Sequence, residues 1–133
     1  VASHGLRVLS GAISRRRDLA EMMTGLLADL APRVRTPVHH AGVVPVVANY
    51  QILAERRDDL RGHLIDRGIE VKVHYPIPIH LQTAGRALGY GPGDCPVVEQ
   101  QAQETLTLPL HQYMADDDLE YMAETITAFY RNG

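Results

Sequence analysis

The chain has 133 residues, and its proportions of apolar residues (45%) and charged residues (22%) are ordinary for a globular protein. A net charge of -3 argues against a surface for nucleic acid or acidic membranes, because either would need a basic patch. The single cysteine excludes a disulfide framework and a thiolate metal site, and no apolar stretch approaches the ~20 residues of a membrane helix. No signal peptide is recognisable either, so we expect a cytoplasmic protein.

The N-terminal third is predicted to contain two helices. Residues 1–9 indicate the tail of a first helix that Gly11 stops, and Ser14 is a suitable N-cap for a second. The run Arg15–Arg17 falls at this start and favours a solvated face. Pro32 ends the second helix. Its apolar residues have the spacing of one helix face: Leu19, Met22, Met23, Leu26, Leu27 and Leu30.

A strand–helix–strand unit is predicted next. The first strand is expected over Val46–Leu53, after Pro45 interrupts a valine-rich stretch. A helix follows, with acidic residues in its first turn and Gly68 as its C-cap. Its apolar side carries Leu60, Leu64 and Ile65. The second strand is expected over Ile69–His74, and the length of the whole fits a βαβ or split βαβ unit.

The last fifty residues alternate short elements with loops. A short helix ends at Gly89, the stretch GYGPGDCP (89–96) predicts a loop, and Pro96 begins a helix that runs to about Glu104. LTLPL (106–110) predicts a short strand. The final helix has Asp116 as its expected N-cap, with Ala115 as the alternative. Its apolar side comprises Leu119, Met122, Ala123, Ile126 and Phe129.

The predicted fold class is therefore α/β, as an α+β two-layer sandwich. About three short strands pack with four to five helices, and residues 1–133 form a single domain. The chain begins with Val1 and not with methionine, which is typical of a fragment or a processed product.

The segment VKVHYPIPIH (71–80) ends the second predicted strand abruptly. Alternation along the strand places Tyr75 and His74 on opposite faces. Two prolines then keep the chain extended, so it leaves the sheet as a stiff rod that could hold polar side chains at a cleft. The alternative is that the prolines only protect an edge strand. No metal site is predicted, because His74 and His80 lie six residues apart without an evident third ligand.

Residues 68–122 resemble the C-terminal part of the DegT/DnrJ/EryC1/StrS aminotransferases, which are pyridoxal-phosphate (PLP) enzymes that aminate keto sugars. Five landmarks follow one another in the family's order: HYPIPIHLQ, LGY, a GDCP that opens a helix, LTLPLH, and the acidic start of the final helix. The upstream segments RRRDLAEMMTGLLADL and LRGHLIDRGIEVKVHYP also fit the family. The resemblance therefore covers nearly the whole chain.

This resemblance implies the small C-terminal domain of a fold-type I aminotransferase. The large domain of such enzymes, which carries the Schiff-base lysine and most cofactor contacts, is absent from this chain. Lys72, the only lysine, stands where the family does not keep its catalytic lysine, so no catalytic residue is expected here. The resemblance places Tyr75 and His80 at the mouth of the active site, where each could hydrogen-bond a sugar or phosphate. His74 either joins them or is structural.

The implied reaction transfers an amino group from L-glutamate or L-glutamine, through PLP, to a keto-deoxysugar nucleotide in amino-sugar or secondary-metabolite biosynthesis. The implied partners are the N-terminal large domain, the two substrates and a second copy in a homodimer. The alternative is a free-standing, non-catalytic binding module descended from that domain. What precedes Val1 would distinguish the two.

Overall fold

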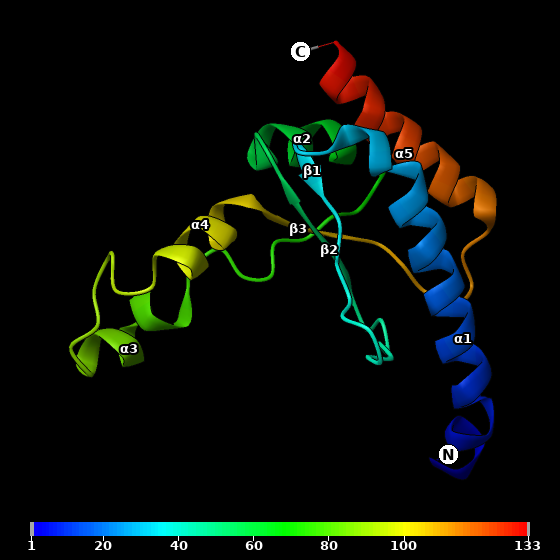
Figure 1. The fold of residues 1–133 in the computed structure, drawn as a ribbon, viewed down its shortest axis with the longest axis horizontal. Coiled ribbons are helices and arrows are strands. Elements are labelled where there is room, and N and C mark those ends of the chain that lie inside the picture. Colours follow the sequence, from blue (N-terminus) through cyan, green and yellow to red (C-terminus); the bar gives the residue numbers. More distant parts are fainter. Residues whose placement is uncertain (1, 133) are drawn as a thin grey trace.

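The computed structural model describes residues 2–132. The helices of residues 2–26, 57–65 and 116–131 pack against one face of a small sheet, and the short helices between residues 83 and 104 project to one side (Figure 1). The helices are α1 (Ala2–Leu26), α2 (Arg57–Ile65), α3 (Thr83–Ala87), α4 (Pro96–Glu104) and α5 (Asp116–Arg131), with 3-10 turns η1 (Ala28–Leu30) and η2 (Ile79–Leu81). The strands are β1 (Val34–Arg35), β2 (Tyr50–Ala54) and β3 (Thr105–Leu108). The expected α/β sandwich is confirmed. None of the described helices is long and apolar enough to cross a bilayer.

The sheet is antiparallel, in the order β1-β2-β3, with Tyr50 opposite Leu108. On the outer side of β3, Lys72 pairs with Thr107 through two backbone hydrogen bonds of 3.1 and 2.7 Å. Because β3 is antiparallel to both neighbours, β2 and the segment around Lys72 run parallel, with β3 between them. This is the split βαβ arrangement, with α2 as the crossover. The expected second strand, Ile69–His74, is reduced to this one bridge.

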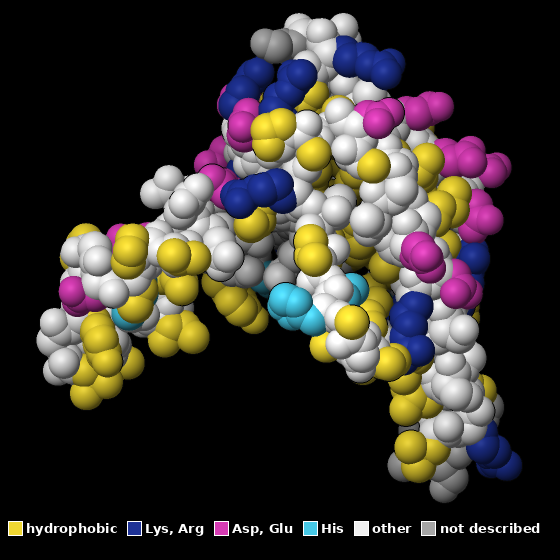
Figure 2. All heavy atoms as spheres, viewed as in Figure 1, with side chains coloured by type: hydrophobic (Ala, Val, Ile, Leu, Met, Phe, Trp, Pro, Cys, Tyr) yellow, Lys and Arg dark blue, Asp and Glu magenta, His cyan; other side chains and the backbone are white. Residues whose placement is uncertain are grey.

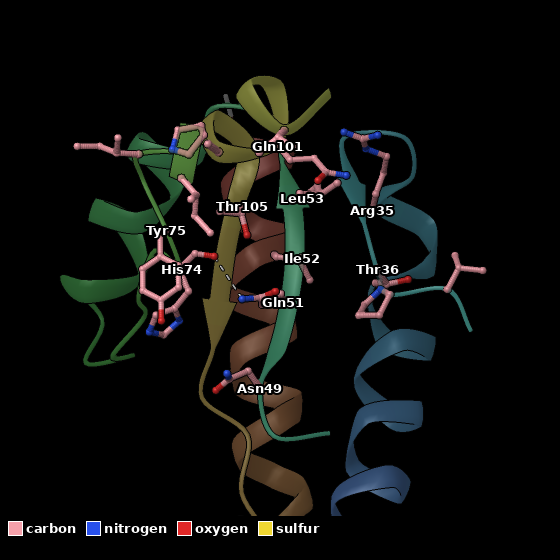
Figure 3. Close-up of a pocket in the computed structure, with 17 residues that line it drawn as sticks. Arg35, Thr36, Asn49, Gln51, Ile52, Leu53, His74, Tyr75, Gln101 and Thr105 are labelled. Carbon is pink, nitrogen blue, oxygen red and sulfur yellow. Dashed lines mark hydrogen bonds between the residues drawn. The ribbon is translucent and has the colours of Figure 1, made fainter. Parts of the chain in front are cut away.

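The core lies between the sheet and the helices. In β2, Ile52 is buried and Gln51 is exposed, so the strand turns one face to the helices and the other outward. Buried side chains of α5, among them Leu119 and Ile126, pack in the same hydrophobic cluster as Ile52. In the close-up view α5 lies behind the strands, and the other face of the sheet, which carries Gln51, borders a pocket (Figure 3).

The expected break in the first helix is wrong. Helix α1 continues through Gly11 and Ser14 and ends at Leu26. A glycine inside a helix costs only about 1 kcal/mol relative to alanine, which one long packed helix can tolerate. Val1 lies outside the described residues.

The triple-arginine run is also not a solvated face. Arg15 donates to the Met114 carbonyl at 3.1 Å, and Arg17 donates to the Pro45 carbonyl at 2.6 Å. The run lies in the middle of α1, where its guanidinium groups hold two loops against the helix. These contacts join residues far apart in the chain, so composition alone could not reveal them.

Smaller differences concern element ends. Strand β2 begins at Tyr50, later than expected, and Ile65 of α2 is exposed. The N-cap of α5 is Ala115, whose N–H donates to the Asp118 carboxylate at 3.0 Å, and Asp116 is already inside the helix. The Asp118 carboxylate, at the third helical position, thus accepts from the backbone N–H of the N-cap residue, as in the second half of a capping box.

Tyr130, near the end of α5, makes the stability of the fold depend on pH under alkaline conditions. Its hydroxyl donates to the Glu55 carbonyl at 2.6 Å, and burial, together with the Glu55 carboxylate, raises the pKa of Tyr130 from 10.0 to about 12. The pKa of Tyr130 is higher in the folded chain than in the unfolded chain. Its contribution to the free energy of unfolding is therefore present below pH 10 and is lost as the pH rises towards 12.

We therefore expect Tyr130→Phe to weaken the loss of stability over this pH range, measured by urea unfolding at several pH values. Burial also raises the pKa of Tyr50, so part of the dependence should remain. Tyr113→Phe, at an exposed position, is the control. An identical pH dependence in Tyr130→Phe and the unaltered chain would contradict this assignment.

Candidate functional site

A pocket of about 730 Å³ lies on the open face of the sheet (Figure 3). The end of β1 and the following residues form one wall, and β2 forms the floor. The opposite wall has two parts, helix α4 and segment 74–79, called the rod below. The segment is not extended as expected, because it bends at His74, Pro76 and Ile77 and enters η2 at Ile79. The space-filling view shows the molecule hollowed between the α3–α4 lobe and the rest of the chain (Figure 2).

Tyr75 and His74 both line this pocket. Tyr75 is 71% exposed, and its ring meets the His74 ring edge-to-face at 5.4 Å. Alternation along a strand predicted opposite faces for them. That prediction is wrong because the last backbone pair of this segment is formed by Lys72, and the chain has left the sheet before His74.

The imidazole of His74 is held from the sheet side. Its Nδ1 lies 2.9 Å from the Thr107 hydroxyl, and its backbone carbonyl accepts a hydrogen bond of 3.4 Å from the Gln51 amide. His74 is therefore bonded to β3 and also borders the pocket.

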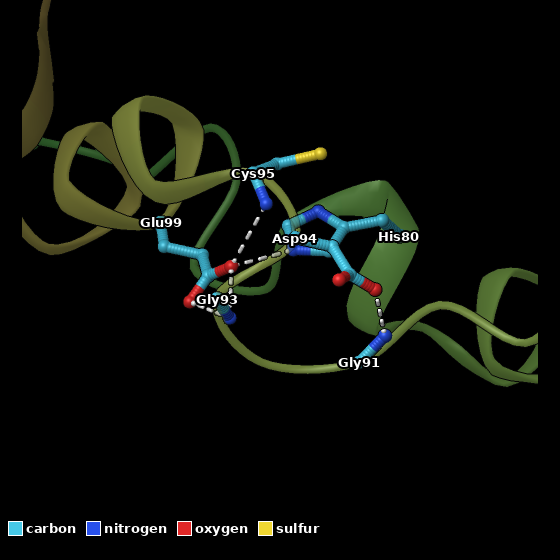
Figure 4. A network of polar contacts seen from close by, with 6 residues as sticks. All are labelled: His80, Gly91, Gly93, Asp94, Cys95 and Glu99. Carbon is cyan, nitrogen blue, oxygen red and sulfur yellow. Dashed lines mark hydrogen bonds and ion pairs between the residues drawn. The ribbon is translucent and has the colours of Figure 1, made fainter.

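His80 lies elsewhere. It is 8% exposed, it is not among the residues that line the pocket, and its Nε2 lies 2.9 Å from Glu99 Oε1 (Figure 4). The hydrogen bond from His80, followed by that from the Gly93 N–H, holds the pKa of Glu99 below its usual value. An ionised carboxylate can only accept, so His80 carries a proton on Nε2.

Several pocket residues escaped the sequence analysis. Gln51 projects from the floor, while Asn49, Gln101 and Thr105 add amide and hydroxyl groups at its edges (Figure 3). Arg35 stands at the rim and is paired with Glu104. The outward position of Gln51 between two buried neighbours in β2 is a signal that alternation could have supplied.

These groups are suited to a hydroxylated ligand, since they offer neutral donors and acceptors in a partly apolar hollow. Lys72 is not among them, because it lies in the sheet edge and pairs with Glu70 at 3.1 Å. The pocket therefore has no amine for a Schiff base, and these residues do not fit PLP by themselves. Within residues 2–132, no group of three or more His, Cys, Asp or Glu side chains could hold a metal ion.

The fold matches part of solved aminotransferase structures. A Streptomyces venezuelae structure, DesV in complex with a ketimine intermediate, matches with a TM-score of 0.88 and 31% identity, over 93% of this chain and 33% of that one. A DegT DnrJ EryC1 StrS aminotransferase from Brucella abortus matches with a TM-score of 0.85 and 32% identity, over 95% of this chain and 33% of that one.

Sequence comparison gives the same result. A pleiotropic regulatory protein of Geobacillus stearothermophilus is 37% identical over 119 residues, which are 89% of this chain and 32% of that protein. The dTDP-3-amino-3,4,6-trideoxy-alpha-D-glucose transaminase of Streptomyces venezuelae is 37% identical over 100 residues, which are 75% of this chain and 26% of that protein.

The profile of the DegT/DnrJ/EryC1/StrS aminotransferase family matches residues 1–127, and the chain belongs to this family. The resemblance seen in the sequence is thereby confirmed. The chain spans about a third or less of the length of these curated relatives.

Proposed function

We propose that this chain is the small C-terminal domain of a PLP-dependent aminotransferase that passes an amino group from L-glutamate or L-glutamine to a keto-deoxysugar nucleotide. The observation that carries the proposal is the pocket on the outer sheet face, lined by His74 and Tyr75 in a chain that belongs to the family. The name of the Streptomyces venezuelae transaminase supports a dTDP-linked sugar as the substrate class.

The cofactor and the catalytic lysine would come from a large domain, as would most contacts to the cofactor phosphate. PLP supplies the electron sink for such chemistry when bound. The exposed apolar side chains of Ile77 and Ile79, which line the pocket, favour such a covering partner. A cytoplasmic homodimer remains part of this proposal, in line with the family.

The chain's own residues would bind and orient the sugar nucleotide. The Tyr75 hydroxyl can donate to, or accept from, a sugar hydroxyl or a phosphate oxygen. His74 Nδ1 is engaged by Thr107, which leaves Nε2 for a ligand, and the Gln51 amide lies on the floor beside it. None of these groups needs to move a proton, so their contribution would be to substrate affinity and orientation.

A non-catalytic binding module is the second candidate. Two relatives carry names that are not those of enzymes: the pleiotropic regulatory protein above, and the erythromycin biosynthesis sensory transduction protein EryC1 of Saccharopolyspora erythraea, 33% identical over 123 residues. On this reading the same pocket would bind a sugar nucleotide without turnover.

An assay of the full-length protein that contains this chain separates the two. We expect PLP-dependent amination of a keto-sugar nucleotide, and we expect this chain alone to give no Schiff-base absorbance with PLP. Tyr75→Ala should raise the KM for the sugar nucleotide about tenfold, as the loss of one good hydrogen bond would. Tyr113→Ala is the control, because Tyr113 is exposed and does not line the pocket.

Two results would contradict the proposal. A Schiff-base band from the chain alone that disappears in Lys72→Ala would move the catalytic lysine into this chain. Sugar-nucleotide binding without any turnover in the full-length protein would favour the binding module.

A further inference from the structure

The pocket wall formed by the rod and α4 is held together from behind by one side-chain pair. Ile79 and Val98 line the pocket, and the residue that follows each of them in the chain belongs to this pair. His80 follows Ile79, Glu99 follows Val98, and their side chains meet at 2.9 Å (Figure 4). The distance between the rod and α4, the two halves of the wall, thus depends on the hydrogen bond between His80 and Glu99.

We propose that Glu99 is a positioning residue for the sugar-binding pocket, because its hydrogen bond to His80 fixes the rod against α4. This inference rests on the proposed function of the pocket. It assigns a role to a residue outside the pocket, and it gives His80 a place behind the wall in contrast to the ligand contact expected from the sequence.

The carboxylate of Glu99 is held by backbone donors as well. Its Oε1 accepts hydrogen bonds from the Gly93 N–H at 2.8 Å and from the Cys95 N–H at 3.3 Å, and Oε2 also accepts from Gly93 at 3.1 Å. One side chain therefore connects η2, the loop before α4 and α4 itself. Charge-assisted bonds of this kind are stronger and more directional than neutral ones.

The anchor on the other side of the pair is also restrained. His80 is buried, and it lies directly against α3, where Gly85 leaves no room for even a methyl group beside the His80 backbone. The backbone of His80 is therefore held close to α3 and not to α4. Breaking the bond should therefore change the width of the wall, since neither half has another described side-chain tie to the other.

The chemistry makes Glu99→Gln an informative change. Glutamine has nearly the same shape, but it replaces one acceptor oxygen with an NH₂ donor, which must face His80 or the backbone N–H groups of the loop. For His80, glutamine can place an N–H near the position of Nε2, whereas alanine cannot. The pair His80→Gln and His80→Ala thus separates the hydrogen bond from the rest of the side chain.

The test uses the full-length enzyme for kinetics and this chain for amide hydrogen exchange. We expect Glu99→Gln to raise the KM for the sugar nucleotide about tenfold, with kcat changed by less than about twofold, as expected from losing one charge-assisted bond that acts on binding. His80→Ala should behave in the same way, and His80→Gln should restore most of the affinity. Glu124→Gln, at an exposed position on α5, is the matched control.

Amide hydrogen exchange tests the effect of the His80–Glu99 hydrogen bond on the lobe directly. Glu99→Gln should accelerate exchange at Gly93 and Cys95 while leaving the Thr107 amide in the sheet protected, because only the lobe loses its anchor. An unchanged KM in Glu99→Gln, or a His80→Gln variant as impaired as His80→Ala, would overturn the proposal. If Glu99→Gln did not fold, the two His80 variants would decide the question.

Failure of the proposed function would look different. If the unaltered full-length protein had no transaminase activity, the proposed function would be refuted. The exchange experiment would still test whether the His80–Glu99 hydrogen bond positions the loop before α4. Faster exchange at Gly93 in Glu99→Gln would support it, and unchanged exchange would refute it.

Discussion

Arg57→Ala is expected to lower the free energy of unfolding by about 2–4 kcal/mol, because it removes a buried charged donor and leaves two carbonyls unpaired. The guanidinium Nη1 of Arg57 donates to the Ala102 carbonyl at 3.1 Å and to the Thr105 carbonyl at 2.9 Å. The side chain is almost completely buried, so water cannot readily replace these bonds. Urea unfolding followed by circular dichroism measures the change.

The control for this prediction lies on the same helix. Arg61→Ala removes the same charge from α2 at an exposed position and should change stability by no more than about 0.5 kcal/mol. A loss in Arg57→Ala as small as that in Arg61→Ala would show that the two carbonyl contacts contribute little.

The position of Arg57 also gives it a consequence for the pocket. Ala102 and Thr105 lie at the junction where α4 passes into β3, and both line the pocket. Arg57 therefore anchors the sheet end of α4, while Glu99 ties its other end to the rod. We expect Arg57→Ala to affect the whole wall through stability, in contrast to Glu99→Gln, whose effect should appear in KM.

The helices were largely predictable because their signals are local. The apolar spacing of Leu119, Met122 and Ile126 follows from the helical repeat, and all three are buried. Pro96 begins α4 as expected, since the missing N–H of proline costs nothing in the first turn. Signals of this type depend on neighbours within a few residues, and so the sequence is sufficient to read them.

The errors concern contacts between distant residues. Arg15 and Met114 are 99 positions apart, and nothing in the local sequence distinguishes this arginine from a solvated one. The early start expected for β2 followed valine content, but pairing decides where a strand begins, and the pair of Tyr50 with Leu108 lies at the end of the β2–β3 ladder.

The sequence predicted which residue types form the candidate site, but not the direction in which each side chain points. The HYP segment identified Tyr75 and His74, and both line the pocket. His80 carries the same chemistry, yet its ring is turned to Glu99, 19 positions further along the chain. Only the folded backbone determines which way a histidine at the end of a stiff segment points.

Gly85→Ala is expected to destabilise the protein by about 1–3 kcal/mol, the usual cost of forcing a methyl group into a filled space. A Cβ at Gly85 would lie 2.5 Å from the His80 carbonyl oxygen and 2.7 Å from its carbonyl carbon. Both are backbone atoms, so the contact can be relieved only if α3 moves away from η2. Urea unfolding gives the loss of stability, and amide exchange at Gly93 reports whether the lobe opens.

Gly62→Ala makes the same chemical change with the opposite expected sign. Gly62 lies inside α2 with nothing within 4 Å of the added methyl group, so helix propensity alone should act and should stabilise by up to about 1 kcal/mol. Equal effects at the two positions would contradict the close approach of α3 to His80. We expect Gly85→Ala to accelerate exchange at Gly93 but not at Thr107. This result would mean that α3 positions His80 for its hydrogen bond to Glu99. The pocket wall would then depend on η2, α3 and the loop before α4 folding as one unit.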